Sequence, residues 1–304
     1  MTRTLAILGA GIFFAYAAHA QPPGVTREMI MRQLPLEGAP LAVAGPYETV
    51  MEPVAGSPRL AVYRPAKLDA FPKKDTLPVL VWGNGGCALE SKQFGGYLKT
   101  IAAHGYLVIT TASPEGANPP RATADDLKAA LDWSQAEATR SGSPLAGKID
   151  AKHVAVMGVS CGGFLTIALS SDPRVSTIGV FNSGVQPPAA GGGGGGAAFP
   201  TTDALAKIHT PTLYLNGGEP DFMMATSKAN FDAINNVPIF YGSRSNAGHS
   251  ATYFHPGGGE FANVTVAWLD WQLKGNKKAS EMFVGDKCGL CTNSTWETHS
   301  KRLK

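Results

Sequence analysis

The sequence predicts an α/β fold with a mostly parallel central sheet and helices on both faces. Short apolar runs that end near glycines alternate along the chain with longer amphipathic stretches, and this alternation is typical of parallel strands joined by helical crossovers. The 304 residues are 44% hydrophobic and only 16% charged, which is enough apolar material for one sizeable core. A single large domain is therefore expected.

The elements of this fold are expected in a regular order. Residues 27–32 favour a helix, and residues 47–64 favour two strands joined by a turn at 55–58. Later strands are predicted at short apolar runs, and helices at stretches with helical spacing of apolar residues. These strands lie at 78–82, 106–110, 153–157, 177–181, 211–215 and 238–241, and these helices at 92–104, 123–140, 164–170, 227–234 and 261–273.

The two ends of the chain are expected to lie outside the domain, which then covers residues 21–275. Residues 1–20 have the pattern of a secretory signal peptide: Arg3, an apolar run, and a small-x-small site ending at Ala20. Because the apolar run is shorter than the roughly 20 residues that a bilayer requires, we expect cleavage and export without a membrane anchor. The mature protein is then secreted or periplasmic, with residues 276–304 as a cysteine-containing tail.

One segment interrupts the alternation of strands and helices. Residues 187–200 contain six consecutive glycines, at 191–196. Glycine loses the most backbone entropy on ordering, so this segment is predicted to be a flexible surface loop.

The charge balance argues against a nucleic-acid partner. The formal net charge is +3, and lysine and arginine form no long basic run. Nucleic-acid binding needs a concentrated basic surface, which this sequence does not predict.

A candidate nucleophile, Ser160, lies in the segment 158–162, Gly-Val-Ser-Cys-Gly. With 36 glycines in the chain a chance match to this pattern is easy, so its setting decides. A predicted strand precedes it and a predicted helix follows, which resembles the nucleophile elbow of the α/β-hydrolase fold. The flanking glycines leave room for the sharp turn, and the helix N-terminus directs N–H groups at developing negative charge.

A serine hydroxyl needs a base, which an acid orients. In this fold the acid and then the histidine follow the serine along the chain. His249, between the strand at 238–241 and the last helix, is the first candidate base, and His255 in the same loop is the alternative. Asp221 is chosen as the acid over Glu219, because the loop must extend a few residues beyond its strand to reach the histidine.

An oxyanion hole requires two backbone donors. One is expected from Cys161, the residue after the nucleophile, and one from the glycine-rich turn after the strand at 78–82. Asn84 is the first candidate in that turn and Gly85 the second. No P-loop pattern follows the turn, so a phosphate-binding role is not expected.

The four cysteines form an even set, which favours disulfides in an exported protein, and three pairings are possible. Cys87 and Cys161 lie on the two loops that would build one oxyanion hole. We therefore predict a Cys87–Cys161 disulfide, with Cys288–Cys291 closing a short loop in the tail. A redox role for the latter pair is not favoured, because it lies in a C-terminal tail rather than at a strand-to-helix junction. A zinc role is not favoured, because a second Cys or His pair at zinc-finger spacing is missing. No metal and no organic cofactor is expected.

With these features the chain resembles lid-poor α/β-hydrolases: dienelactone hydrolases, chlorophyllases and cutinase-like polyester (PET) hydrolases. The resemblance covers residues 45–275 and is carried by the turn at 83–84, the strand entry at 104–110, Ser160 with Gly163, Asp221, His249 and the helix residues 266–271. It implies an α/β-hydrolase fold with little or no lid. Polyester hydrolases usually carry an aromatic residue and a Met where this chain has Val159, Cys161 and Asn84, and the tail around Cys288 and Trp296 is not theirs.

The resemblance also implies that residues 182–186 and the glycine run lie over the active site. Val185 and Gln186 are then expected to contact substrate, and the glycine run is a hypothetical flap that admits bulky esters. The function expected is carboxylic-ester hydrolysis through an acyl-enzyme. The alternatives are a polyester hydrolase, a peptidase or lactonase with the same triad, and a non-catalytic exported binding protein on the same fold.

Overall fold

The computed structural model describes residues 26, 28, 36, 38–114, 121–188 and 199–304. The expected leader at 1–20, most of the helix expected at 27–32 and the glycine run at 191–196 lie outside the described residues. None of the helices that the structure describes is long and apolar enough to span a bilayer.

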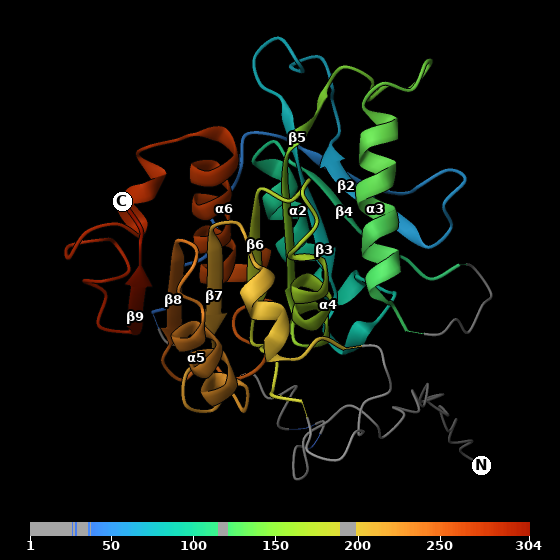
Figure 1. Cartoon of the computed structure of the whole chain (residues 1–304). Helices are drawn as coiled ribbons and strands as arrows, with labels where there is room; N and C mark the ends of the chain where they lie inside the picture. The colour runs from blue at the N-terminus through green and yellow to red at the C-terminus, as the bar shows by residue number, and fades with distance from the viewer. Residues whose placement is uncertain (1–25, 27, 29–35, 37, 115–120, 189–198) are drawn as a thin grey trace, which may run out of the picture.

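The described residues form one nine-stranded sheet in the order β1-β2-β4-β3-β5-β6-β7-β8-β9 (Figure 1). The block from β4 to β8 is parallel, whereas β1, β2 and β9 run antiparallel to their neighbours. The strands are β1 Thr49–Pro53, β2 Leu60–Pro65, β3 Leu77–Gly83, β4 Leu107–Thr111, β5 Ile149–Val159, β6 Thr177–Phe181, β7 Thr212–Asn216, β8 Ile239–Arg244 and β9 Trp296–Lys301.

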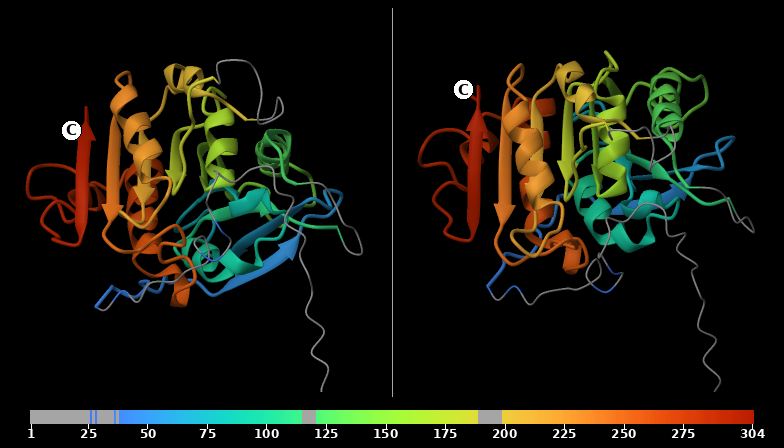
Figure 2. Two further views of the ribbon diagram at one scale, coloured as in Figure 1. Left: turned by 90° about the horizontal axis from the view of Figure 1, so that it is seen from below. Right: turned by 60° about the horizontal axis from the view of Figure 1, so that its bottom comes forward.

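Helices cover both faces of this sheet (Figures 1 and 2). Their apolar sides belong to two clusters of buried residues: α3, α4 and α5 contribute to one, and α2 and α6 to the other. The helices are α2 Gly95–Ala103, α3 Ala124–Glu137, α4 Cys161–Leu169, α5 Met224–Ala233 and α6 Gly259–Lys274, with 3-10 helices η1 Gly85–Cys87, η2 Lys92–Phe94, η3 Thr202–Lys207, η4 Pro256–Gly258 and η5 Ala279–Met282. The predicted fold class is therefore confirmed.

The central strands form where the sequence is continuously apolar, without polar residues at every second position. Every residue of β3, β4 and β6 is buried, because both faces of these strands are covered. The strands and helices expected between residues 47 and 273 are all present, although their ends shift. For example, β5 begins at Ile149 rather than at 153, and α4 begins at Cys161 rather than at 164.

The C-terminal tail differs from the expectation of a segment outside the domain. Trp296–Lys301 forms β9, which pairs with β8 and extends the sheet. Trp296 is buried, and its indole Nε1 donates to Glu260 of α6 at 2.6 Å. The Cys288–Cys291 disulfide closes the loop before this strand. The strand was not predicted because most of its residues are polar, as suits a sheet edge, and its pairing is fixed by one aromatic residue.

Candidate active site

Ser160 lies on a sharp turn between β5 and α4, with φ 54° and ψ −119°. This left-handed backbone conformation is rare for a residue with a side chain. The glycines around it are required by close backbone contacts: a Cβ on Gly162 would lie 2.0 Å from Gly83 O, and one on Gly158 would lie 2.4 Å from Gly162 O. Ser160 is half-buried at the start of α4, which is the geometry of a nucleophile elbow.

The structure pairs the predicted acid and base. His249 Nδ1 lies 2.8 Å from Asp221 Oδ1, and both side chains are almost fully buried. Because an ionised carboxylate only accepts hydrogen bonds, His249 Nδ1 is the donor. The second ring nitrogen, Nε2, is buried and has no hydrogen-bond partner among the described residues. With its proton on Nδ1, the ring leaves Nε2 as a free base.

The alternative acid and base are not brought together. Glu219 is exposed. His255 is half-buried and its backbone caps η4 rather than meeting a carboxylate of the acid loop. The choice of Asp221 with His249 therefore agrees with the geometry.

The pKa of Asp221 is lowered despite its burial. Burial by itself raises the pKa of a carboxyl, but the hydrogen bond and charge of His249 lower it, as do the backbone N–H of Met223 and the amide of Asn182. The donors lie 2.8 to 3.3 Å from the carboxylate and include the N–H of Gly217. Asp221 is thereby held ionised, which keeps it an acceptor for the His249 proton.

A three-residue segment connects the candidate nucleophile to the acid and base. Phe181 O accepts the N–H of Ser160 at 2.9 Å, and Ser183 Oγ donates to Ser160 O at 2.7 Å. Between them, Asn182 Nδ2 donates to Asp221 Oδ2 at 2.8 Å and to the carbonyl of Gly248, next to His249, at 3.3 Å. The end of β6 therefore joins three loops that are far apart in the sequence.

An aromatic ring also covers the candidate base. Phe222 stacks on the His249 imidazole, with ring centroids 4.1 Å apart and planes inclined by 28°. Phe222 follows the acid directly along the chain and is half-buried. The sequence placed residues 182–186 over the site but assigned no role to Asn182, and it did not indicate Phe222. The position of Phe222 next to Asp221 was the one available signal.

The expected oxyanion turn lies beside the elbow because β3 pairs with β5, and Gly83 is opposite Gly158. Asn84 is buried, and its side chain is turned into the loop, where Nδ2 donates to Ala88 O and Thr111 Oγ1 at 3.1 Å. Gly85 is half-buried at the start of η1. Cys161 is the first residue of α4, where backbone N–H groups have no partner within the helix. Which of these groups act as donors to a substrate remains a prediction.

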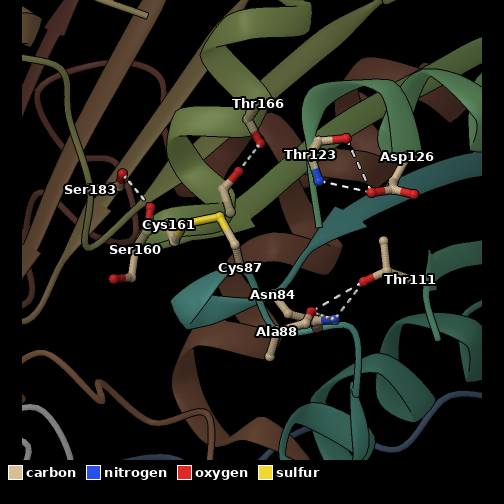
Figure 3. Close-up of a disulfide and its surroundings, with 11 residues drawn as sticks. Asn84, Cys87, Ala88, Thr111, Thr123, Asp126, Ser160, Cys161, Thr166 and Ser183 are labelled. Atoms are coloured by element: carbon tan, nitrogen blue, oxygen red, sulfur yellow. Dashed lines mark hydrogen bonds between the residues drawn. A yellow bond between two sulfur atoms is a disulfide. The ribbon is translucent and has the colours of Figure 1, made fainter. Parts of the chain in front are cut away.

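A disulfide between Cys87 and Cys161 joins these two loops (Figure 3). The Cα atoms are 5.1 Å apart, and both residues are buried. The pair Cys288–Cys291 forms the second disulfide, so both pairings agree with the prediction from the sequence.

The two residues expected to contact substrate differ in exposure. Val185 is only 3% exposed and belongs to the buried cluster to which α4 and α5 contribute, and its backbone bonds to Asn230 of α5. Hydrogen bonds to α5 hold this part of the loop inward, and contact of Val185 with a substrate stays a prediction. Gln186 is exposed and stays a candidate.

Two further predictions concern the loop at 187–200 and metal binding. Only the ends of the loop at 187–200 are described, and there Phe199 packs against Phe164 of α4 with ring centroids 5.3 Å apart. Within the described residues, no group of three or more His, Cys, Asp or Glu side chains is arranged to hold a metal ion.

Comparison with known proteins places this geometry in a family. A family model of PET hydrolase-like proteins matches residues 41–299, which includes most of the tail that the sequence resemblance had left out. Cutinase est1 of Thermobifida alba is 28% identical over 174 residues, which are 56% of this chain and 52% of the cutinase. The match thus spans about half the length of that curated relative. The mostly parallel sheet with flanking helices is the α/β-hydrolase fold of this group, and the chain belongs to the PET hydrolase-like family.

Proposed function

We propose that the chain hydrolyses carboxylic esters of the cutinase and polyester type, through an acyl-enzyme on Ser160. The observation that carries this proposal is the buried Asp221–His249 pair, in which His249 Nε2 is free to accept a proton. Hydrogen bonds of residues 181–183 connect the His249 loop to the Ser160 turn. A buried acid and base next to an elbow serine is the arrangement that activates a hydroxyl for acyl transfer.

In the first half of the reaction, Ser160 Oγ attacks the ester carbonyl carbon while His249 Nε2 takes the hydroxyl proton. Asp221 accepts the Nδ1–H of the ring and stabilises the imidazolium that forms. When the tetrahedral intermediate collapses, the C–O bond to the alcohol breaks and His249 returns the proton to the departing oxygen.

The second half repeats these transfers with water. His249 removes a proton from a water molecule, which attacks the acyl carbon, and the acid leaves as Ser160 recovers its proton. The backbone N–H of Cys161, with that of Asn84 or Gly85, would stabilise the oxyanion in both halves. The start of α4 adds its helix dipole to the same region.

Family membership and the cutinase relative support an ester, including esters within a polymer, as the bond cleaved. We propose an extracellular or periplasmic location, with residues 1–20 as the leader and residues 21–275, extended by the tail, as the hydrolase domain. The two disulfides support this, because such bonds persist in oxidising compartments.

A fluorophosphonate probe, which forms a covalent bond only with an activated serine, tests the proposal directly. We expect the wild-type protein to label and to hydrolyse short p-nitrophenyl esters. Ser160→Ala should not label, and its kcat/KM should fall by at least about a thousandfold, because the nucleophile is lost. The substitution is small and half-buried, so its Tm should match the wild type.

A substrate panel of soluble esters, a polyester film, a lactone and a peptide then separates the reactions that this triad could perform. Faster turnover of the lactone or the peptide than of any ester would contradict the proposed substrate class. Folded wild-type protein that neither labels nor hydrolyses any of these substrates would support a binding protein on the same fold instead.

A further inference from the structure

Asn182 occupies a position that its backbone makes unusual. It follows β6 directly, is fully buried, and has φ 46°, in the left-handed region that few side chains other than Asn and Asp tolerate. Its N–H donates to Leu215 O of β7 at 2.7 Å, which fixes the turn. The side chain is thereby held at the point where the loops after β5, β7 and β8 meet.

The orientation of the Asn182 amide follows from its neighbours. Asp221 Oδ2 and Gly248 O can only accept hydrogen bonds, so the amide presents its NH₂ group to both. The remaining oxygen, Oδ1, accepts from the buried hydroxyl of Tyr253 at 3.2 Å. Every polar atom of this side chain therefore has a partner, and one amide bridges the acid loop and the base loop.

The two oxygens of Asp221 have different partners. Oδ1 accepts from His249 Nδ1 and from the N–H of Met223, whereas the side-chain donor to Oδ2 is Asn182. A hydrogen bond from an amide to an ionised carboxylate stabilises the charged form. It also fixes the direction in which the other oxygen points, and through it the plane of the imidazole.

We propose that Asn182 is a positioning residue for the Asp221–His249 pair, fixing the orientation of the acid and, through it, that of the base. This inference deepens the proposed function and rests on it for its effect on turnover. It goes beyond the predicted triad, because it adds a fourth side chain that acts through Asp221 rather than on the substrate.

The test uses Asn182→Gly, because glycine accepts a φ of 46° without strain and removes the side chain with its hydrogen bonds to Asp221, Gly248 and Tyr253. The proton on His249 Nδ1, observed by NMR as a strongly downfield resonance, reports on its bond to Asp221. We expect this resonance to change position in Asn182→Gly, because Asp221 loses a donor. We expect kcat to fall about 10- to 100-fold, the effect of one hydrogen bond to a charged group, with KM within about twofold of wild type.

Two companion variants make the result decisive. Ser183→Ala changes the neighbouring residue of the same segment. The hydroxyl that it removes bonds to Ser160 O and not to Asp221, so the His249 resonance should stay in place. Asn182→Asp keeps the side-chain volume and places a second carboxyl beside Asp221, so the two groups share a proton and the bond from Asp221 to His249 changes. This variant serves if the glycine variant does not fold. A resonance unchanged in every folded Asn182 variant would overturn the proposal.

Failure of the proposed function would look different. In that case the wild-type protein would not label with the fluorophosphonate, whereas the NMR comparison between wild type and Asn182→Gly would still decide whether Asn182 positions the pair.

Discussion

Ser160 holds a backbone conformation that normally costs about 1–3 kcal/mol. Hydrogen bonds around the turn offset this cost: Ser160 N–H donates to Phe181 O, and Gly163 N–H donates to Ser160 O, both at 2.9 Å. The strained turn is thus held by the end of β6 and by the first turn of α4. A turn held in this way keeps Ser160 at the start of α4, where the proposed nucleophile belongs.

At the same scale, Gly162→Ala is expected to destabilise the fold by about 3 kcal/mol or more, because the new Cβ would lie 2.0 Å from the backbone oxygen of Gly83. Thermal unfolding measures the effect. Gly96→Ala in α2 is the matched control, since its Cβ would meet neighbours at 3.5 Å, an ordinary contact. Its Tm should equal or exceed that of wild type. Equal Tm values for the two variants would contradict the close packing of the elbow on β3.

Residues whose role depends on chain order could be predicted from the sequence, and residues whose role depends on packing could not. Asp221 and His249 follow Ser160 in the order that the fold imposes, and the structure brings the two together. Asn182 gains its role only where three loops meet, and no local pattern marks it. The burial of Val185 likewise depends on bonds to Asn230 of α5, which is distant in sequence.

At the scale of elements, the Cys87–Cys161 disulfide joins η1 to α4 across a separation of 74 residues, whereas Cys288–Cys291 spans 3. Loop-closure entropy assigns about 4.4 kcal/mol to the first disulfide and about 1.6 kcal/mol to the second. The double variant Cys87→Ala with Cys161→Ala should therefore lose more stability in urea unfolding than Cys288→Ala with Cys291→Ala.

The tail pair is the internal control of this experiment, because it removes the same number of sulfur atoms. A larger loss from the tail pair would show that the bridge at the elbow is not the main covalent constraint. If the elbow bridge also positions the oxyanion donors, kcat should fall in the elbow variant and stay near wild type in the tail variant.

The elements themselves were predictable to different degrees. The central strands are apolar on both faces, so their positions follow from composition alone, and β6 has the predicted bounds. In contrast, β9 is polar and lies at the sheet edge, where only Trp296 is buried. Its place depends on a buried contact with Glu260, which also pairs with Arg244 at the end of β8.

At the scale of the whole molecule, surface carboxylates make stability depend on pH. Arg174 donates from Nη1 to Asp132 Oδ1 of α3 and from Nη2 to Asp172 Oδ2, both at 2.6 Å. Hydrogen bonds from Arg174 are the main cause that lowers the pKa of both carboxyls. Because these groups are partly exposed, each pair contributes about 1 kcal/mol or less.

A lowered pKa in the folded state means that this contribution is present above the unfolded pKa, about 3.9, and disappears as the pH falls through the folded value. Asp172→Asn should therefore lower Tm at pH 7 and reduce the further drop in Tm between pH 5 and pH 3, because one of the groups that must take up a proton is gone. Asp286→Asn makes the same change of charge at an exposed tail position with no ion pair among the described residues, and it should leave the slope of Tm against pH at its wild-type value. Identical slopes for Asp172→Asn and wild type would show that acid unfolding is governed elsewhere, with the buried Asp221 carboxylate as the next group to substitute.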